Sequence, residues 1–540
     1  MLRRFLYLMV AALLWGNIAQ AEKTGLVNPR IIGGTPALTG AQPWMASLLT
    51  SYTVSASLAS FCGATLIRSD VVVTAAHCVE GFVAEDLDVV LGTTDLSQVS
   101  ASDRIGVASI VVHPDYDWET YDSDIALLKL ERASDGVPIE LVTATAMSQM
   151  SEGQMLTTLG WGMTSATDTN SYVDVLRQVD LPYVSQSSCI AAVGSGVTNN
   201  MFCAGTGLGD KDSCQGDSGG PIIWRQGETA VLAGLVSWGD GRGCAVVNTY
   251  GVYVRLAAYL DWIKQTMSRV HFEPVGHLGY LNQGASSRHG FWAHNWNLDS
   301  AAQLGPISAP IGQIFSSLEH QCDEIEVNAS CRFEVLLTNN IVGFEQQLYS
   351  ISFNTGYQQQ VVMSADVLTR INVGEEFSQG FTHWFSGGAA MWQQDPGNPK
   401  VYASGSVTHS ESSVLQTTVE GPGLLNFSWA ASTEKDYDYL DLYINGELYD
   451  WRTGNALLWD DYALEFPAGD YVLSWRYVRD FEGGFGADKA WLKGLSWQLL
   501  SAPVRVSDGG NGGGGSISIW AAFGILVLLR IGGRINKIKI

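Results

Sequence analysis

Residues 212–221, with the sequence Asp-Ser-Cys-Gln-Gly-Asp-Ser-Gly-Gly-Pro, constrain the fold of this chain more than any other stretch. Ser218 stands among glycines, which let the backbone turn sharply and let a substrate approach closely. A serine hydroxyl is a poor nucleophile until a neighbouring base takes its proton. The chain must therefore fold so that a histidine, and a carboxylate to orient that histidine, reach Ser218 from elsewhere in the sequence.

The residues that Ser218 needs lie upstream, in two short segments. His77 is the histidine of Thr-Ala-Ala-His-Cys (residues 74–78), and Asp124 is the second aspartate of Asp-Ser-Asp-Ile-Ala-Leu-Leu (residues 122–128). Three segments in the chain order His, Asp, Ser resemble the chymotrypsin/trypsin family of serine endopeptidases. Several independent motifs agree in order and spacing, and we expect a trypsin-like protease domain over residues 31–268.

Short apolar runs separated by Gly, Asp and Ser predict that this domain is all-β. The runs comprise residues 71–73, 89–91, 107–112, 125–130 and 231–236. The resemblance implies a double six-stranded β-barrel with the active site in the crevice between the barrels. Leu260, Ile263 and Met267 have helical spacing, which predicts a terminal helix over residues 257–267.

The resemblance assigns a catalytic role to each of the three residues. Ser218 is expected to attack the scissile carbonyl, and His77 to accept its proton and pass it to the leaving amine. Asp124 is expected to hold the imidazole tautomer and to stabilise the imidazolium. The backbone N–H groups of Gly216 and Ser218 are expected to form the oxyanion hole. The triad is complete, which separates this chain from relatives that keep the fold but have lost the chemistry.

Asp212, six residues before Ser218, is expected to determine the substrate preference. In the family this position is the floor of the pocket for the residue before the cleaved bond. A buried carboxylate there selects Arg and Lys through a charge-assisted hydrogen bond. The resemblance places Ser213, Ser237, Trp238, Gly239 and Gly251 in the same substrate-binding pocket.

The sequence Arg30-Ile31-Ile32-Gly33-Gly34 resembles an activation site. In the family, cleavage after the basic residue frees an amino terminus, which turns inward and pairs with the aspartate beside the nucleophile. Those partners are Ile31 and Asp217 in this chain. A buried charge is tolerated only when it is paired, so the resemblance implies an inactive precursor with residues 22–30 as the activation propeptide.

Eight cysteines allow 105 pairings in principle. The resemblance implies the disulfide bonds Cys62–Cys78, Cys189–Cys203 and Cys214–Cys244, which leave Cys322 and Cys331 as a fourth, local pair.

We expect no metal and no other cofactor. Family members that bind calcium place several glutamates in a surface loop, whereas residues 92–105 offer only Asp95 and Asp103. Tyr250 stands where relatives with tyrosine can bind a sodium ion nearby, and sodium regulation is left open.

The N-terminus and the overall charge indicate an exported protein. Residues 1–21 have a basic start, an apolar core and an Ala-Gln-Ala end, as in a secretory signal peptide. Export agrees with oxidised cysteines. The net charge of −24 argues against nucleic acid as a partner, since nucleic acid attracts basic surfaces.

The second half of the chain resembles non-catalytic β modules. Residues 269–374 resemble bacterial immunoglobulin-like modules, and residues 375–505 resemble extracellular jelly-roll-like β-sandwiches. These modules could bind a glycan or another surface ligand. Four tryptophans in the second of these modules either stack on sugars or pack in the core of the module. They are Trp384, Trp392, Trp451 and Trp459.

Residues 506–540 comprise a glycine-rich linker, an apolar segment and a basic end. This order resembles the GlyGly-type C-terminal sorting signals of Gram-negative surface proteins, which use the type II secretion machinery and are processed by a rhomboid-like protease. The alternative is a permanent inner-membrane anchor, a transmembrane helix with its basic end inside.

Two functions from different classes follow from these features. The first is a secreted or surface-attached serine endopeptidase of a Gram-negative bacterium, cleaving protein or peptide substrates after Arg or Lys and activated by cleavage after Arg30. The second is an adhesin or glycan-binding surface protein whose protease domain is secondary. The complete triad together with Asp212 favours the first.

Overall fold

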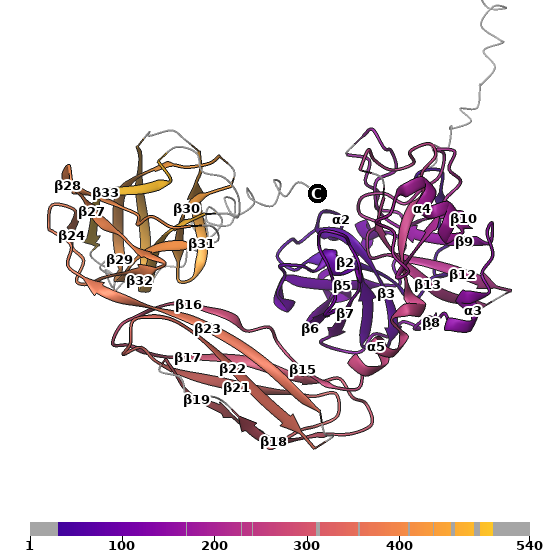
Figure 1. The fold of residues 1–540 in the computed structure, drawn as a ribbon, viewed down its shortest axis with the longest axis horizontal. Coiled ribbons are helices and arrows are strands. Elements are labelled where there is room, and N and C mark those ends of the chain that lie inside the picture. Colours follow the sequence, from indigo (N-terminus) through magenta and orange to yellow (C-terminus); the bar gives the residue numbers. More distant parts are fainter. Residues whose placement is uncertain are drawn as a thin grey trace, which may run out of the picture. The chain divides into compact units, whose positions relative to one another are not determined.

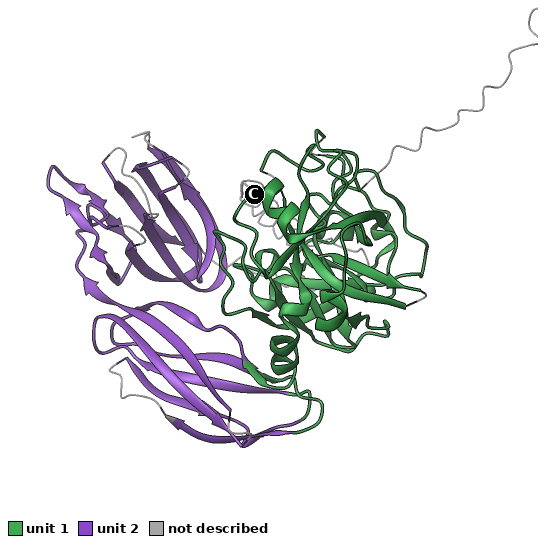
Figure 2. Ribbon diagram, turned by 45° about the vertical axis from the view of Figure 1, so that its right-hand side comes forward, with its two compact units in different colours: residues 1–271, 294–300, 327–329 green, residues 272–293, 301–326, 330–540 purple. Residues whose placement is uncertain are grey.

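The computed structural model describes residues 31–500, apart from residues 169, 228, 240, 309–313, 355–356, 409–410, 436, 455–458 and 480–486. The predicted signal peptide, the activation propeptide with Arg30, and the C-terminal sorting tail lie outside the described residues. Two compact units make up the chain (Figure 2): unit 1 contains residues 1–271, 294–300 and 327–329, and unit 2 contains the rest.

Six strands of unit 1 close into a first antiparallel barrel in the order β2-β3-β4-β7-β6-β5 (Figure 1). Apolar runs form these strands, and every residue of β4 and β7 is buried. The predicted runs at 71–73, 89–91, 107–112 and 125–130 all fall in this barrel. Its strands are β2 (Met45–Thr50), β3 (Ser60–Arg68), β4 (Val71–Thr74), β5 (Leu87–Leu91), β6 (Ile105–Val112) and β7 (Ala126–Leu130).

Six further strands form a second barrel in unit 1. Antiparallel pairing runs from β9 through β10, β11, β14, β13 and β12 and returns to β9, which closes the ring. The double-barrel prediction is therefore confirmed. The strands are β9 (Met155–Gly160), β10 (Arg177–Val184), β11 (Met201–Ala204), β12 (Pro221–Gln226), β13 (Thr229–Trp238) and β14 (Gly251–Arg255), with the short β1 (Thr35–Pro36) and β8 (Glu140–Leu141) paired to β10 and β13.

Among the described residues of unit 1, helices are few and short. The predicted terminal helix is α5 (Leu260–Thr266), which begins three residues later than expected. The reason is a preceding 3₁₀ turn, η5 (Leu256–Ala258), in which the N–H of Tyr259 bonds the carbonyl of Leu256. The other helices of four or more residues are α2 (Ala56–Ala59), α3 (Ala144–Ser148) and α4 (Gln186–Val193).

Unit 1 continues beyond residue 268, because residues 294–300 and 327–329 pack with the barrels. Trp296 is fully buried in the core that both barrels share. Its indole N–H donates to the hydroxyl of Ser109 at 3.0 Å, and Arg68 donates to its carbonyl at 2.8 Å. Arg68 also binds the carbonyl of Met267 at 3.1 Å. A segment distant in sequence therefore completes the core of the two barrels.

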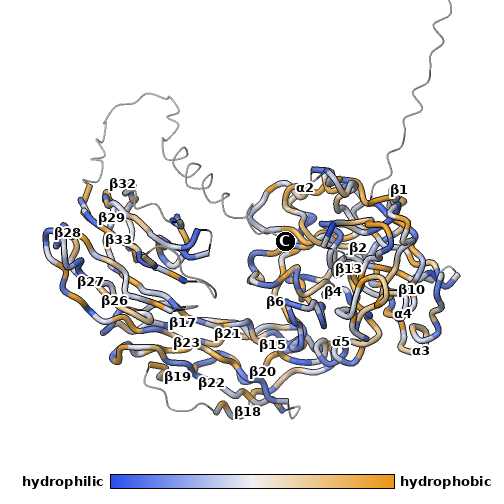
Figure 3. The backbone as a smooth tube through the Cα atoms, turned by 45° about the horizontal axis from the view of Figure 1, so that its top comes forward, coloured by the Kyte–Doolittle hydropathy of each residue, from blue (hydrophilic) through white to orange (hydrophobic). Residues whose placement is uncertain are grey.

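Unit 2 is built from further β-sheets, and in both units hydrophobic and hydrophilic residues alternate along many strands (Figure 3). In β21 the side chains of Cys331, Phe333, Val335 and Leu337 are buried while those between them are not, so this strand has one buried face. Strands β16 to β23 carry the first sheets of unit 2: β16 (Gly276–Asn282), β17 (Ser286–Asn295), β18 (Ala302–Ser308), β19 (Phe315–His320), β20 (Glu324–Ile325), β21 (Ser330–Thr338), β22 (Gly343–Phe353) and β23 (Gln358–Ile371).

The last part of unit 2 is organised around the long strand β29 (Ser412–Ser432), which pairs with β32 (Asp460–Val478) and β33 (Lys489–Leu499). Trp384 and Trp392 are buried in its hydrophobic core, which supports the packing interpretation for these two tryptophans. No helix within the described residues is long and apolar enough to cross a membrane. The remaining strands are β24 (Ser378–Gln379), β25 (Trp384–Gly388), β26 (Ala390–Met391), β27 (Gln393–Asp395), β28 (Asn398–Ala403), β30 (Tyr439–Ile444) and β31 (Glu447–Arg452).

Candidate active site

His77 and Asp124 meet because the strands beside them pair. His77 lies in the 3₁₀ turn that follows β4, and Asp124 lies just before β7, the antiparallel partner of β4. Oδ2 of Asp124 is 2.8 Å from Nδ1 of His77, and Oδ1 accepts the backbone N–H of His77 at 2.9 Å. A carboxylate at Nδ1 holds the neutral imidazole with its proton on that nitrogen, so Nε2 is left unprotonated and can act as a base.

Ser237 contacts this pair from the second barrel. Its hydroxyl donates to Oδ2 of Asp124 at 2.5 Å. Asp124 is buried and accepts three hydrogen bonds, one from Ser237 and two from His77. The sequence placed Ser237 in the substrate pocket, but local sequence carries no signal that its hydroxyl reaches the Asp124 carboxylate.

Ser218 is brought to the histidine by backbone packing. Its carbonyl accepts the N–H of Gly63 at 2.7 Å, and the neighbouring Cys62 is disulfide-bonded to Cys78, next to His77. At Gly219, which has φ +72°, a Cβ would lie 2.1 Å from Oγ1 of Thr74 in β4. The strand end that leads to the histidine therefore abuts the nucleophile segment.

The Ser218 hydroxyl has no hydrogen bond to His77 within the part of the chain that the structure describes. Hydrogen bonds between a catalytic nucleophile and its base are often long in the free enzyme and tighten in the substrate complex. The absence of this hydrogen bond therefore does not argue against catalysis, and the position of the Ser218 backbone is the more informative feature.

Two backbone N–H groups, at Ser218 and the nearby Gly216, are available to a ligand. In the described chain, the N–H groups of Gly216 and Ser218 have no acceptor, whereas those of Asp217, Gly219 and Gly220 bond to backbone carbonyls. Gly216 has φ +91°, a conformation that favours glycine. Gly216 and Ser218 are partly exposed, and two free donors on alternate residues form a site suited to a negatively charged oxygen.

Asp212 presents an unpaired carboxylate oxygen. Its Oδ2 accepts the N–H of Ala245 at 2.7 Å, while Oδ1 is shielded from solvent and has no partner among the described residues. Burial raises the pKa of Asp212 to about 6. A Cβ at Gly251 would lie 2.9 Å from that Oδ1, so only glycine leaves space beside the carboxylate.

Gly239, Trp238 and Ser213, the other expected pocket residues, differ in their exposure to solvent. At Gly239 a Cβ would have no atom within 4 Å, so the chain there borders open space. The half-buried Trp238 ends β13. Ser213 is buried, with its hydroxyl 3.1 Å from that of Tyr253.

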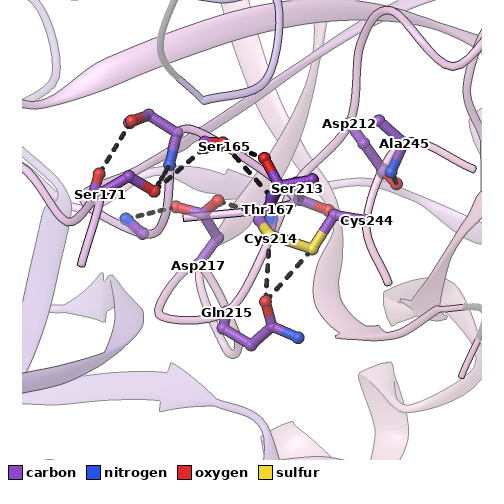
Figure 4. The surroundings of a disulfide bond; sticks show 12 residues. Ser165, Thr167, Ser171, Asp212, Ser213, Cys214, Gln215, Asp217, Cys244 and Ala245 are labelled. Atoms are coloured by element: carbon purple, nitrogen blue, oxygen red, sulfur yellow. Dashed lines mark hydrogen bonds between the residues drawn. A yellow bond between two sulfur atoms is a disulfide. The ribbon is translucent and has the colours of Figure 1, made fainter. Parts of the chain in front are cut away.

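Four disulfide bonds join the eight cysteines as Cys62–Cys78, Cys189–Cys203, Cys214–Cys244 and Cys322–Cys331. The third ties the nucleophile segment to the segment that carries Ala245, and Figure 4 shows this disulfide between Asp212 and Asp217. The two segments that border the Asp212 carboxylate are thus linked covalently.

Asp217 is a fully buried carboxylate that lies between backbone donors. It accepts the N–H groups of Gly162 and Cys214, each at 2.9 Å (Figure 4). Burial, with a smaller contribution from the charge of Asp212, raises the pKa of Asp217 to about 7. Two hydrogen bonds do not offset the cost of burying this charge, so a cation beside Asp217 would stabilise its ionised form.

The start of the described chain runs beside this region. The Ile31 side chain is fully buried, and the carbonyl of Ile32 accepts the N–H of Asp212 at 3.1 Å. At Gly33, which has φ +75°, a Cβ would lie 2.3 Å from the carbonyl oxygen of Asp210. Residues 31–33 therefore pack closely against the segment that carries Asp212.

A double β-barrel with a His–Asp pair and free N–H donors at a neighbouring serine defines a serine endopeptidase. Residues 31–263 match the trypsin family model. The chain is 38% identical over 242 residues to trypsin-3 of Salmo salar, which covers 45% of this chain and 94% of that protein. It is 37% identical over 242 residues to cationic trypsin-3 of Rattus norvegicus, covering 45% and 91% respectively. The chain therefore belongs to the trypsin family.

A solved structure resembles more of the chain. The secreted serine protease VesC from Vibrio cholerae aligns with a TM-score of 0.53 and 23% identity, over 87% of this chain and all of that one. The similarity in fold thus extends beyond the two barrels.

Proposed function

We propose that this chain is an exported serine endopeptidase that cleaves after Arg or Lys and is made as a zymogen activated by cleavage after Arg30. The observation that carries the specificity is the unpaired, buried Oδ1 of Asp212. A guanidinium or ammonium group in the pocket would supply the missing hydrogen bonds and the opposite charge.

In the proposed mechanism, Ser218 attacks the carbonyl carbon while Nε2 of His77 takes the hydroxyl proton. Asp124 keeps the other imidazole proton on Nδ1 and stabilises the imidazolium. The N–H groups of Gly216 and Ser218 bind the oxyanion, and each such donor contributes roughly 10²–10³ in rate. His77 then protonates the leaving amine, and water repeats the sequence on the acyl-enzyme.

The proposed zymogen switch depends on Asp217. Before cleavage, the nitrogen of Ile31 is an uncharged amide and cannot neutralise a buried carboxylate. Cleavage after Arg30 would create an ammonium at Ile31, and pairing with that ammonium would stabilise ionised Asp217. Since Asp217 lies between Gly216 and Ser218 in the sequence, its anchoring would hold both N–H donors in place.

Export is proposed from the N-terminal signal sequence, and the similarity in fold to VesC, a secreted serine protease of Vibrio cholerae, supports it. We also propose passage through the type II secretion machinery with removal of the tail by a rhomboid-like protease, and a glycan or surface ligand for unit 2. Mass spectrometry of the mature protein tests the tail, because an intact Ile540 would contradict its removal.

A peptide assay tests the enzymatic proposal. Chromogenic peptides that end in Arg, Lys, Phe or Glu are offered to the secreted protein, to Ser218→Ala and to Asp212→Ser. We expect turnover of the Arg and Lys peptides only, no turnover by Ser218→Ala, and loss of the basic preference in Asp212→Ser. An unchanged preference in Asp212→Ser would refute the proposed specificity.

N-terminal sequencing tests activation by cleavage. The sequence of the active form should begin at Ile31, and full activity of the uncleaved Arg30→Gln protein would refute the proposed zymogen.

A further inference from the structure

A second aspartate, Asp122, lies two residues before Asp124 and binds the other barrel. Its Oδ1 accepts the hydroxyl of Thr198 at 2.6 Å and the side-chain amide of Asn200 at 3.1 Å, and its Oδ2 accepts that same amide at 3.2 Å. Thr198 and Asn200 directly precede β11 of the second barrel. The carboxylate of Asp122 therefore links the loop that carries Asp124 to the opposite barrel.

The donors of this link are held firmly. The carbonyl of Thr198 accepts the side-chain amide of Gln186 at 2.8 Å, and the carbonyl of Asn200 accepts the N–H of Arg255 at 2.7 Å. Arg255 also donates from Nε to the carbonyl of Asn199 at 3.0 Å. Because the turn at residues 198–200 is anchored to α4 and to the end of β14, it provides a fixed point for Asp122.

The backbone on both sides of Asp122 adopts an unfavourable conformation. Tyr121 and Ser123 each have φ +56°, in the left-handed region that residues with a side chain rarely adopt. Such residues persist only where the surrounding structure holds them. The hydrogen bonds of Asp122 to Thr198 and Asn200 supply that restraint midway between the two strained residues.

Both strained residues bear on His77. Ser123 directly precedes Asp124, whose two oxygens bind the imidazole and the backbone of His77. The ring of Tyr121 lies edge-on to the imidazole, with ring centroids 5.6 Å apart and an angle of 74° between the planes. A relaxed turn at Asp122 would therefore shift a carboxylate and a ring that both contact the expected base.

We propose that Asp122 is a positioning residue for catalysis: its link to Thr198 and Asn200 holds the strained turn that orients Asp124 and Tyr121 against His77. Asp122 has no contact with His77 in the described chain, so it acts through its neighbours. This inference rests on the proposed catalytic role of His77 and Asp124.

The test separates positioning from folding. Wild type, Asp122→Ala, Asn200→Ala and the exchange variant D122N/N200D are activated, titrated with a serine-reactive fluorophosphonate, and assayed with an Arg chromogenic peptide. The exposed Asp135 provides the control, Asp135→Ala. Misplacement of a catalytic group by about 1 Å lowers rates by roughly 10². We expect kcat per titrated site to fall about 10- to 100-fold in Asp122→Ala and Asn200→Ala, with KM within about twofold of wild type.

The exchange variant reverses the direction of donation between positions 122 and 200 and should recover most of the lost kcat. The Asp135→Ala control should match wild type. Should Asp122→Ala fail to fold, Asn200→Ala decides, because it removes the amide donor from the other barrel. Two results would overturn the role of Asp122 while leaving the proposed function intact. One is a wild-type kcat per titrated site in the folded single variants, and the other is a loss of kcat that the exchange variant does not recover. Activity that survives Ser218→Ala would overturn the proposed function as well.

Discussion

The hydroxyl of Ser237 donates a 2.5 Å hydrogen bond to Oδ2 of Asp124, the same oxygen that contacts Nδ1 of His77. Ser237 belongs to β13 in the second barrel, while Asp124 precedes β7 in the first. The bond therefore joins the two barrels at the carboxylate that contacts His77. A carboxylate held by donors from two directions keeps its orientation during proton transfer.

Removal of this donor should lower activity without loss of the fold. A hydrogen bond to a charged group contributes about 1.5–3 kcal/mol, so Ser237→Ala should reduce kcat/KM on an Arg peptide by about tenfold or more. The lost hydrogen bond should also lower the melting temperature, by about 2–4 °C per kcal/mol, but the fold should be kept because alanine fills most of the same space. Ser151→Ala removes an exposed hydroxyl and serves as the control. Equal kcat/KM in wild type and Ser237→Ala would contradict the role given to this bond.

The buried carboxylate of Asp217 predicts that the stability of the uncleaved protein depends on pH. Burial raises the pKa of Asp217 to about 7, so the folded uncleaved protein holds a proton that the unfolded chain releases near pH 4. Stability falls with pH wherever the folded state binds more protons. The melting temperature of the uncleaved Arg30→Gln protein should therefore decrease as the pH rises from about 4 to 7 and then level off.

Two comparisons isolate Asp217 as the source of that slope. The double variant R30Q/D217N lacks the Asp217 carboxyl and should lose the larger part of the decrease, while Asp212, whose pKa is raised to about 6, accounts for a smaller part that remains. The cleaved wild-type protein should also show a smaller decrease, because an ammonium at Ile31 would favour the ionised carboxylate. A slope that is the same in all three proteins would assign the effect to other groups.

The short apolar runs were enough to predict an all-β domain, and the resemblance carried by the segments around His77, Asp124 and Ser218 implied the double barrel. Contacts between distant segments were not predictable in the same way. The bond from Ser237 to Asp124, the link from Asp122 to Thr198, and the insertion of Trp296 depend on which strands meet in space. The helix α5 also begins later than the apolar spacing predicts, since that spacing does not distinguish an α-helix from the 3₁₀ turn before it.

Trp296 leads to a prediction about the extent of the protease fold. It is fully buried among residues of the barrels, and the replacement of a buried Trp by alanine costs about 3–5 kcal/mol. Trp296→Ala should therefore lower the melting temperature of the protease by several degrees. A chain truncated after residue 268 should be destabilised in the same direction, because it lacks Trp296 altogether.

The control for Trp296 is Trp292, whose side chain is 41% exposed. Trp292→Ala should leave protease stability nearly unchanged, as measured by thermal inactivation of peptide turnover. A truncated protein as stable as the full chain would show that residues 294–300 contribute nothing to the protease fold.

A comparison of alanine substitutions at Gly219 and Gly227 separates a steric clash beside Ser218 from backbone strain. Both have positive φ, +72° and +68°, so a side chain at either position introduces similar strain. A Cβ at Gly219 would lie 2.1 Å from Oγ1 of Thr74 and 2.9 Å from the nitrogen of Ala75, whereas a Cβ at Gly227 would meet no atom within 4 Å. Gly219→Ala must therefore push the Ser218 segment away from the strand end that leads to His77. Because displacement by about 1 Å lowers rates by roughly 10², we expect kcat/KM to fall at least 100-fold in Gly219→Ala and less than threefold in Gly227→Ala. Similar losses in the two variants would mean that strain alone, and not the packing of Gly219 against Thr74, governs the position of the nucleophile.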